Sequence, residues 1–377
     1  PRLVISRPST YHSYTPLLHS GSDHMSFVFT VCQAGAEAAL KNEISRRHPE
    51  LRFAFSRPGF VTFKTPDTRG FIENFQLKSV FARMWGHSIG KVVGADSATM
   101  VRQYVDLLAA KLSAEQLAGC RHVHVWERDR YVPGSRGFEP GVSVLATEIG
   151  RILEPENDAG NALRGVNAIP ESEEHVIDCV LVEPGEWWIG WHVAEQGPSC
   201  WPGGTPQIEL PTEAVSRTWL KMVEGLMWSG FPVKAGDTVV EIGSSPGGSC
   251  QALLGLGLKV TGIDPAEMDE ALTKEPNFTH IRGRAKEQPR RIFSNVRWLA
   301  SDASAVPNYA LDTIEAIVTH SSVNIEGLLL TLKFTDWKLA DEIPLYHKRI
   351  RSWGFQKVRS RQLAFNRREI CVAATKD

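Results

Sequence analysis

The chain has 377 residues, of which 42% are hydrophobic and 23% charged, and its formal net charge at pH 7 is −1. This length supplies enough residues for two or three domains with cores of their own. The near-zero net charge excludes a protein that is basic as a whole, and no apolar run approaches the roughly 20 residues of a membrane-spanning helix. The composition is that of a soluble globular protein.

The cysteines and histidines do not form a recognisable framework. The six cysteines are scattered without C-x-x-C spacing, so the pattern favours neither a zinc site nor a set of disulfides. Among the twelve histidines there is no H-x-x-x-H pair, and His122 and His124 lie on one face of an expected strand. We expect reduced thiols, a cytoplasmic location and no bound metal.

The N-terminal half predicts two α+β regions. Residues 1–25 lack periodicity and are expected to be a disordered tail or, in part, a cloning remnant. The next elements, up to residue 95, are a strand, a helix and two strands at Phe27–Val31, Ala36–Arg47, Arg52–Phe55 and Phe60–Lys64. From 96 to 200 the pattern predicts helices at Met100–Lys111 and Val142–Leu153, and strands at His122–Trp126, Val176–Val182 and Trp187–His192. Clusters of Pro, Asn, Asp and Gly predict a solvent loop at Glu154–Glu174.

The most informative segment of the C-terminal half is Val239–Gly248, which reads VVEIGSSPGG. An apolar run typical of a buried parallel strand ends there in a Gly-rich turn, and a helix-like pattern begins at Gln251. Glycines let the backbone approach a ligand closely, and a helix N-terminus offers unpaired N–H groups. A second apolar run ends in Asp264, where nucleotide-binding α/β folds hold ribose hydroxyls. The sequence therefore predicts a site for a nucleotide-type cofactor.

The spacing Glu-Ile-Gly-x-x-Pro-Gly-Gly matches neither the dinucleotide motif nor the phosphate loop. It resembles motif I of S-adenosylmethionine-dependent methyltransferases, in the variant typical of enzymes that methylate RNA ribose. Those enzymes carry a Lys-Asp-Lys-Glu tetrad. The resemblance implies that the tetrad consists here of Lys221, Asp302, Lys333 and Glu369, which occur in the required order.

The closest resemblance is to the bacterial 23S rRNA cytidine 2′-O-methyltransferases of the RlmM type. It covers most of the chain from about Phe27 onward and is tight after Trp187. The segments that carry it, besides the tetrad, are 80–85, 186–191, 202–206 and 211–217. It implies an α/β protein with a ferredoxin-like module at 26–95, a THUMP-type RNA-binding domain at 96–200 and a Rossmann-like methyltransferase domain at 201–377.

The same resemblance implies S-adenosylmethionine as the cofactor. The residues expected to contact it are Thr218, Gly243, Ser245, Pro246, Gly247, Gly248, Asp264 and Asp302. Two positions depart from the family. Ser249 stands where a Trp commonly follows Pro-Gly-Gly, and Arg284 stands where relatives carry an acid that contacts the adenine. We expect these changes to loosen packing or reshape cofactor binding, unless Arg284 faces solvent.

By resemblance, Lys333 accepts the proton of the ribose 2′-hydroxyl. A lysine has a reference pKa near 10.4, so a neutral amine at pH 7 costs about 4.6 kcal/mol. Desolvation and the nearby cation of Lys221 favour the neutral amine, whereas the carboxylates of Asp302 and Glu369 favour the ammonium. The sequence leaves the balance open. The alternative is that Lys333 steers and polarises the hydroxyl while the proton leaves by another route.

These observations predict an RNA ribose 2′-O-methyltransferase acting on a cytidine of 23S rRNA, either naked or in a pre-ribosomal particle, and working as a monomer. Basic clusters at 282–297 and 345–370 fit RNA phosphates, although they could be solvated helix faces. Two alternatives stay open. One is an RNA-binding or ribosome-assembly protein that retains the methyltransferase fold with little turnover, and the other is a small-molecule O-methyltransferase. A surface ion pair of Glu369 with its arginine neighbours, and a turn or cap role for Asp302, are the simpler explanations for those two acids.

Overall fold

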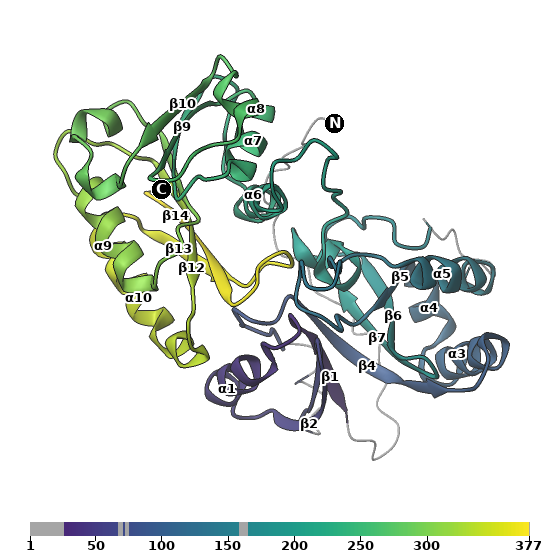
Figure 1. The fold of residues 1–377 in the computed structure, drawn as a ribbon. Helices are drawn as coiled ribbons and strands as arrows, with labels where there is room; N and C mark the ends of the chain where they lie inside the picture. The colour runs from purple at the N-terminus through teal and green to yellow at the C-terminus, as the bar shows by residue number, and fades with distance from the viewer. Residues whose placement is uncertain (1–25, 67–70, 72–74, 158–164, 377) are drawn as a thin grey trace. The chain divides into compact units, whose positions relative to one another are not determined.

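The computed structural model describes residues 26–66, 71, 75–157 and 165–376, and the tail expected at 1–25 lies outside them. The chain divides into two compact units, Pro1–Gln207 and Ile208–Asp377 (Figure 1). Each unit is built around its own seven-stranded sheet. In the described part of the chain, no helix has the length and apolarity required to cross a membrane.

The sheet of the first unit has the strand order β2-β3-β1-β4-β7-β6-β5. Its strands are β1 (Phe27–Val31), β2 (Arg52–Arg57), β3 (Phe60–Lys64), β4 (Met84–Val93), β5 (Cys120–Glu127), β6 (His175–Glu183) and β7 (Glu186–Val193). All neighbouring pairs are antiparallel except β5 and β6. The pairing of β4 with β7 joins the strands of 27–93 and 120–193 into one sheet. The division of this unit into ferredoxin-like and THUMP-type parts stays a prediction.

The helices of the first unit are α1 (Glu37–Arg47), α3 (Ser97–Lys111), α4 (Ala114–Gly119) and α5 (Val144–Asn157). The first turn of α3 is capped by Asp96, whose carboxylate accepts a hydrogen bond from the Thr99 N–H. Apolar residues of α3 and α5, among them Tyr104 and Leu153, are buried against β5, β6 and β7. This burial of one helix face supplies most of the stability that short helices lack alone.

Every helix and strand predicted for this unit is present; Phe27–Val31 and Phe60–Lys64 have the predicted bounds and the others are shifted. Among the described residues, one strand and one α-helix were missed. The loop predicted at Glu154–Glu174 is wrong at its start, because α5 continues to Asn157. Pro155 suggested a break, but a proline in the last helical turn removes only one backbone hydrogen bond. Strand β4 and the short helix α4 were not predicted. The glycines of β4 obscure its pattern, and Gly86 is required because a Cβ there would lie 2.6 Å from the Phe29 ring.

The sheet of the second unit has the order β10-β9-β8-β11-β12-β14-β13. Its strands are β8 (Thr238–Ile242), β9 (Lys259–Asp264), β10 (Phe278–Arg282), β11 (Trp298–Ser301), β12 (Gly327–Lys333), β13 (Lys357–Arg361) and β14 (Glu369–Thr375). The strands from β8 to β12 are parallel, and β14 runs antiparallel to both of its neighbours. The chain builds outward from β8 on one side and returns to β11 on the other. Ligands of such sheets bind at this switch point, outside the carboxyl ends of the strands.

Helices flank both faces of this sheet (Figure 1). They are α6 (Thr218–Ser229), α7 (Gly248–Gly255), α8 (Glu270–Thr273), α9 (Pro307–Val318) and α10 (Ile343–Ser352). Residues of α6 and α7, such as Met222 and Leu253, pack on Val239, Ala300 and Leu329 of the central strands. Helix α6 ends at Gly230, whose left-handed conformation (φ 60°) closes the last turn. The α/β fold class and the Rossmann-like C-terminal sheet are confirmed.

Candidate active site

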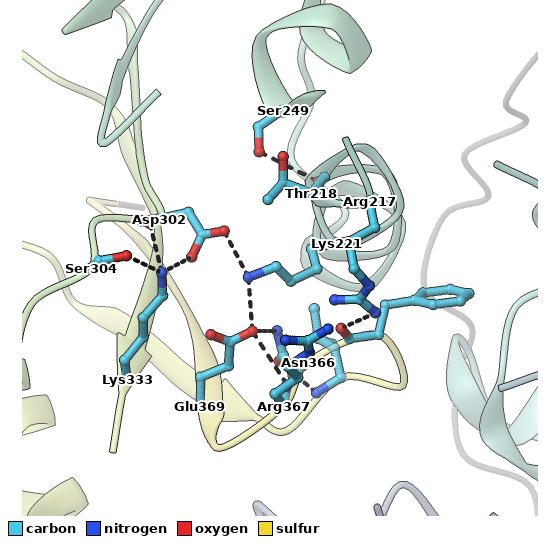
Figure 2. A network of polar contacts seen from close by, with 12 residues as sticks. Arg217, Thr218, Lys221, Ser249, Asp302, Ser304, Lys333, Asn366, Arg367 and Glu369 are labelled. Atoms are coloured by element: carbon cyan, nitrogen blue, oxygen red, sulfur yellow. Dashed lines mark hydrogen bonds and ion pairs between the residues drawn. The ribbon is translucent and has the colours of Figure 1, made fainter. Parts of the chain in front are cut away.

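Lys221, Asp302, Lys333 and Glu369 meet at the carboxyl ends of β11 and β12 (Figure 2). Lys221 lies in the first turns of α6, and Asp302 directly follows β11. Lys333 is the last residue of β12, and Glu369, the first of β14, is its partner in the sheet register. Because β14 is antiparallel to β12, its first residue lies beside the last residue of β12. Four residues far apart in the sequence thus share one site.

The carboxylate of Asp302 joins the two lysines. Its Oδ2 lies 2.7 Å from the Lys221 Nζ, and its Oδ1 lies 3.2 Å from the Lys333 Nζ. The Lys221 Nζ also donates to the Glu369 Oε1 over 2.8 Å. The side chains of Lys221, Asp302 and Glu369 are at least nine-tenths buried, whereas 29% of the Lys333 side chain is exposed. Lys333 is therefore the member of the four that solvent or a substrate reaches most easily.

Lys221 is a fixed positive charge. Burial by itself lowers the pKa of a lysine, but the charges of Asp302 and Glu369, together with the hydrogen bonds to both, outweigh it and raise the pKa of Lys221 above its usual value. At pH 7 the buried part of the site therefore holds one ammonium between two carboxylates. Such pairing is what makes buried charges tolerable.

The simpler explanations for the two acids do not hold. Glu369 is buried and pairs with Lys221. Its carboxylate also accepts a hydrogen bond from the backbone N–H of Arg367 (3.3 Å). It is therefore not a surface ion pair with its arginine neighbours. Asp302 binds two lysines, and the residue that caps the following helix, α9, is Val306.

Helix α6 also holds the loop that carries Glu369. Glu224, one turn after Lys221 and 1% exposed, accepts hydrogen bonds from the backbone N–H groups of Ala364 (2.7 Å) and Phe365 (2.9 Å). Asn366 closes the same loop, since its Oδ1 accepts the Leu363 N–H. The loop between β13 and β14 is thus fixed to the helix that presents Lys221.

A cavity of about 330 Å³ opens at the carboxyl ends of β8, β9 and β11, where Ser301 and Ala303, the neighbours of Asp302 in the sequence, form part of its lining. Apolar side chains form much of its wall, namely Ile242, Ile263, Ala303, Ala310 and Ile314. Asp264 stands at its edge, where its carboxylate accepts the backbone N–H groups of Ser245 (3.2 Å) and Ala266 (2.8 Å). The cavity therefore offers an apolar slot next to a fixed carboxylate.

Of the residues predicted to bind the cofactor, Gly243 and Asp264 line this cavity, and Asp302 lies between the lining residues Ser301 and Ala303. The others surround the start of α7. Ser245 and Pro246, joined by a cis peptide bond, precede Gly247, which has φ 126° at the N-cap of α7. A Cβ on Gly248 would collide with Ser216, whose hydroxyl pairs with that of Thr218 over 2.8 Å. Glycine is required there by the close approach of the chain before α6.

The two positions at which the sequence departs from the family differ in their surroundings. Ser249 is buried, and beside it lies a cavity of about 20 Å³, roughly the space of one water molecule, which Lys221 and Asp302 also line. The loosened packing expected from the missing Trp stays a prediction. Arg284 lines the mouth of the large cavity, but its side chain is 70% exposed and lies 3.7 Å from the Glu287 carboxylate.

Two residues of the site were missed in the sequence. The Ser304 Oγ lies 3.3 Å from the Lys333 Nζ, and Tyr309, 52% exposed, lines the large cavity. Neither belongs to a motif. Their place just after Asp302 could have indicated a role in the site, because the loops at the carboxyl ends of parallel strands carry the ligand contacts of such sheets.

Some side chains of the basic clusters at 282–297 and 345–370 bind partners within the second unit. Arg349 pairs with Asp312 and Glu315, and the guanidinium of Arg359 donates to the carbonyls of Trp228 and Ser229. Cations that stay exposed include Lys286, Arg291, Lys348, Lys357, Arg367 and Arg368. This exposed subset, rather than the whole of each cluster, is suited to phosphate contacts. Within the described residues, no group of three or more His, Cys, Asp or Glu side chains is arranged to hold a metal ion.

Residues 214–339 match the family model of the FtsJ-like methyltransferases. The ribosomal RNA large subunit methyltransferase M of Shewanella sediminis is 25% identical over 319 residues, which are 77% of this chain and 80% of that protein. The protein of the same name from Shewanella woodyi is 28% identical over 316 residues, with the same shares. Among solved structures, TrmN from Thermus thermophilus is 13% identical, with a TM-score of 0.35. The match covers 93% of this chain and 99% of the TrmN chain. The chain thus contains an FtsJ-like methyltransferase domain and is a homologue of the ribosomal RNA large subunit methyltransferases M over about three quarters of its length.

Proposed function

We propose that this protein transfers the methyl group of S-adenosylmethionine to the ribose 2′-hydroxyl of a cytidine in large-subunit ribosomal RNA. The observation that carries the proposal is the arrangement of Lys221, Asp302, Lys333 and Glu369 around shared carboxylates next to a cavity at the switch point of the sheet. The FtsJ-like domain and the names of the relatives support rRNA methylation. The choice of cytidine and the role of Lys333 rest on the resemblance of the motifs.

The cavity fits the cofactor. Its apolar wall suits an adenine ring, and the Asp264 carboxylate stands where the ribose hydroxyls of a nucleotide would lie. Gly243 lines the same cavity, and Thr218 with the turn Ser245–Gly248 would complete the site at the N-terminus of α7. When bound, S-adenosylmethionine supplies a methyl group that its sulfonium already activates.

The residues of the chain then have to place the hydroxyl and take its proton. The bond between the 2′-oxygen and the methyl carbon forms as the carbon–sulfur bond breaks. The hydroxyl proton passes to the Lys333 Nζ, which enters the step as the neutral amine and afterwards releases the proton to solvent. Catalysis of this kind depends mainly on in-line positioning and on a general base. Lys221, Asp302 and Glu369, buried and mutually paired, hold the position of the partly exposed Lys333.

The partner follows from the substrate. RNA is recognised in sequence-specific complexes through exposed single-stranded bases, so the target nucleotide has to be splayed out to bring its ribose to Lys333. Exposed cations such as Lys286, Arg291 and Arg368 would contact phosphates. RNA binding by the first unit, monomeric action in the cytoplasm, and the choice between naked rRNA and a pre-ribosomal particle are parts of the same proposal.

Methyl transfer from labelled S-adenosylmethionine to rRNA from cells that lack the enzyme tests this function. The wild type is compared with Lys333→Ala and with Lys338→Ala, an exposed lysine five residues later. After digestion to nucleosides, we expect label in 2′-O-methylcytidine for the wild type and Lys338→Ala. Lys333→Ala should lose at least about 100-fold in rate, because general-base assistance contributes that much or more. Its affinity for S-adenosylhomocysteine, measured by calorimetry, should stay close to the wild-type value.

Other outcomes would redirect the proposal. Label in a different nucleoside would remove the cytidine, and an undiminished rate in Lys333→Ala would remove the proton acceptor. Label on isolated precursor particles but not on naked rRNA would identify the particle as the substrate. Absence of label on both, with cofactor and RNA binding intact, would favour an assembly protein.

A further inference from the structure

The amine of Lys333 has a second, unanticipated anchor. Its Nζ donates one hydrogen bond to the backbone carbonyl of Asp302 (3.0 Å) and one to the hydroxyl of Ser304 (3.3 Å). The Asp302 Oδ1 lies 3.2 Å away as an ion-pair partner, but it makes no hydrogen bond within the structure. Figure 2 shows Ser304 and Asp302 joined to the Lys333 amine. Ser304 also lines the 330 Å³ cavity that we propose for the methyl donor.

Two hydrogen bonds together fix the rotation of the Lys333 amine, which one hydrogen bond leaves free. The nitrogen of a lysine is tetrahedral, and one of its corners is the bond to Cε. Without Ser304, only Asp302 holds the amine, through one hydrogen bond to its carbonyl and through the ion pair with its Oδ1, so the amine can still rotate about that hydrogen bond. When the Ser304 hydroxyl accepts a second N–H, three corners are set and the direction of the fourth is determined. That fourth corner carries an N–H in the ammonium and the lone pair in the neutral amine.

We propose that Ser304 is a positioning residue for methyl transfer, which fixes the rotation of the Lys333 amine so that its fourth corner faces the reacting 2′-hydroxyl. The inference rests on the proposed function, since it gives Ser304 a role only through Lys333. The proton still passes from the 2′-oxygen to the Lys333 Nζ as the oxygen–methyl bond forms and the carbon–sulfur bond breaks. Ser304 keeps its own proton throughout, because it acts as a hydrogen-bond acceptor.

Ser304 is expected to contribute little to the stability of the fold. Ser304 lies at an exposed position, so removing its hydroxyl leaves no buried donor or acceptor unpaired. Its carbon atoms do not belong to the apolar core of the unit. A variant at this position should therefore fold normally, and a loss of rate in it reports on the site.

The test compares Ser304→Ala with a matched pair, Ser304→Thr and Ser304→Val, which have nearly the same shape and differ in the hydroxyl. Ser321→Ala, an exposed serine after α9, serves as a control. Steady-state methylation of rRNA gives kcat and KM, calorimetry gives the affinity for S-adenosylhomocysteine, and thermal unfolding checks the fold. We expect kcat to fall about tenfold in Ser304→Ala and Ser304→Val, with KM and cofactor affinity within about twofold, because misorientation of a reacting group lowers the rate of the chemical step. Ser304→Thr should stay within about threefold of the wild type.

A double mutant separates this inference from the proposed function. If Ser304 acts through Lys333, adding Ser304→Ala to Lys333→Ala should lower the residual rate no further. A kcat of Ser304→Ala within twofold of the wild type, equal losses in the Thr and Val variants, or an additive loss in the double mutant would each overturn the role of Ser304. An active Lys333→Ala single mutant would instead overturn the proton acceptor.

Discussion

At the scale of single residues, the site balances its charges in pairs. Two lysines, 221 and 333, face two carboxylates, Asp302 and Glu369, and three of the four side chains are almost fully buried. A third carboxyl group, Glu241 on β8, lies behind them and is 1% exposed. A further negative charge there would disturb the balance. Burial raises the pKa of Glu241 to about 8, and the charge of Asp302 adds to the rise, against the hydrogen bond from Cys250 and the cation of Lys221.

Replacing Glu241 should therefore change how stability depends on pH. The unfolded chain ionises this group near pH 4.5, and the folded protein only near pH 8. Its contribution to stability is complete below pH 4.5 and is lost as the pH rises toward 8. In Glu241→Gln this loss is absent. Relative to the wild type, the free energy of unfolding of the variant should increase by about 3 kcal/mol between pH 5 and pH 8.

Urea denaturation of both proteins at several pH values measures this difference. A constant offset between wild type and Glu241→Gln would reflect packing or hydrogen bonding alone. It would mean that Glu241 is already ionised in the folded protein at pH 5, and that the site tolerates three carboxylates.

At the scale of elements, one helix organises both ends of the tetrad. Helix α6 presents Lys221 toward Asp302 and, one turn later, holds the β13–β14 loop through the Glu224 carboxylate. The loop in turn places Glu369 against Lys221. A displacement of this loop relative to α6 would therefore separate Glu369 from the lysine it pairs with.

Glu224→Ala should weaken both the fold and the activity. The change leaves the buried N–H groups of Ala364 and Phe365 without their acceptor, which costs about 1–3 kcal/mol for each group. We expect a destabilisation of about 2–4 kcal/mol in urea denaturation and a lower kcat, because Glu369 is no longer held. Glu270→Ala, on an exposed helix face, is the control and should change the free energy of unfolding by less than about 0.5 kcal/mol. A stable Glu224→Ala with a normal kcat would show that Lys221 alone positions Glu369.

Whether an element or a contact could be predicted from the sequence depends on how local its signal is. Strands that end in a Gly-rich turn or an acid, such as β8 and β9, could be predicted, because the apolar run and the residues that end it are neighbours in the sequence. The ends of parallel strands meet at one edge, so the grouping of Asp264, Asp302 and Lys333 followed. The hydrogen bond from the Ala364 N–H to the Glu224 carboxylate joins residues 140 apart in the sequence, so no local pattern predicts it. Ser304 was missed for the same reason, since its meaning comes from the position of Lys333, 29 residues later.

At the scale of the whole molecule, the two units differ in their buried titratable groups. Among the described residues, five histidines of the first unit are buried, namely His48, His87, His122, His124 and His192, whereas His280, His320 and His347 of the second are at least partly exposed. Burial lowers the pKa of His87 and of His124 to about 4. His192 behaves differently, because its pair with Asp178 (2.6 Å) outweighs burial and raises its pKa.

The first unit should therefore be the acid-sensitive one. In the unfolded chain His87 and His124 take up protons near pH 6.5, but in the folded unit only near pH 4. For each of them, stability falls by about 3 kcal/mol as the pH drops from 6.5 to 4. His192 opposes this, since a raised pKa stabilises the fold below 6.5 and loses that contribution as the pH rises. Burial lowers the pKa of His175 as well. With three groups against one, we expect the first unit to unfold before the second at pH 5, as seen by calorimetry with limited proteolysis.

His87→Phe isolates one of these groups. The ring of His87 stacks on Trp191 with centroids 4.7 Å apart, and a phenyl ring can keep that contact without taking up a proton. The first unit of the variant should lose about 3 kcal/mol less stability than the wild type between pH 6.5 and pH 4. His320→Phe, at an exposed position of the second unit, should leave the pH dependence of both transitions unchanged. If His87→Phe retains the wild-type acid sensitivity, His87 is not its cause.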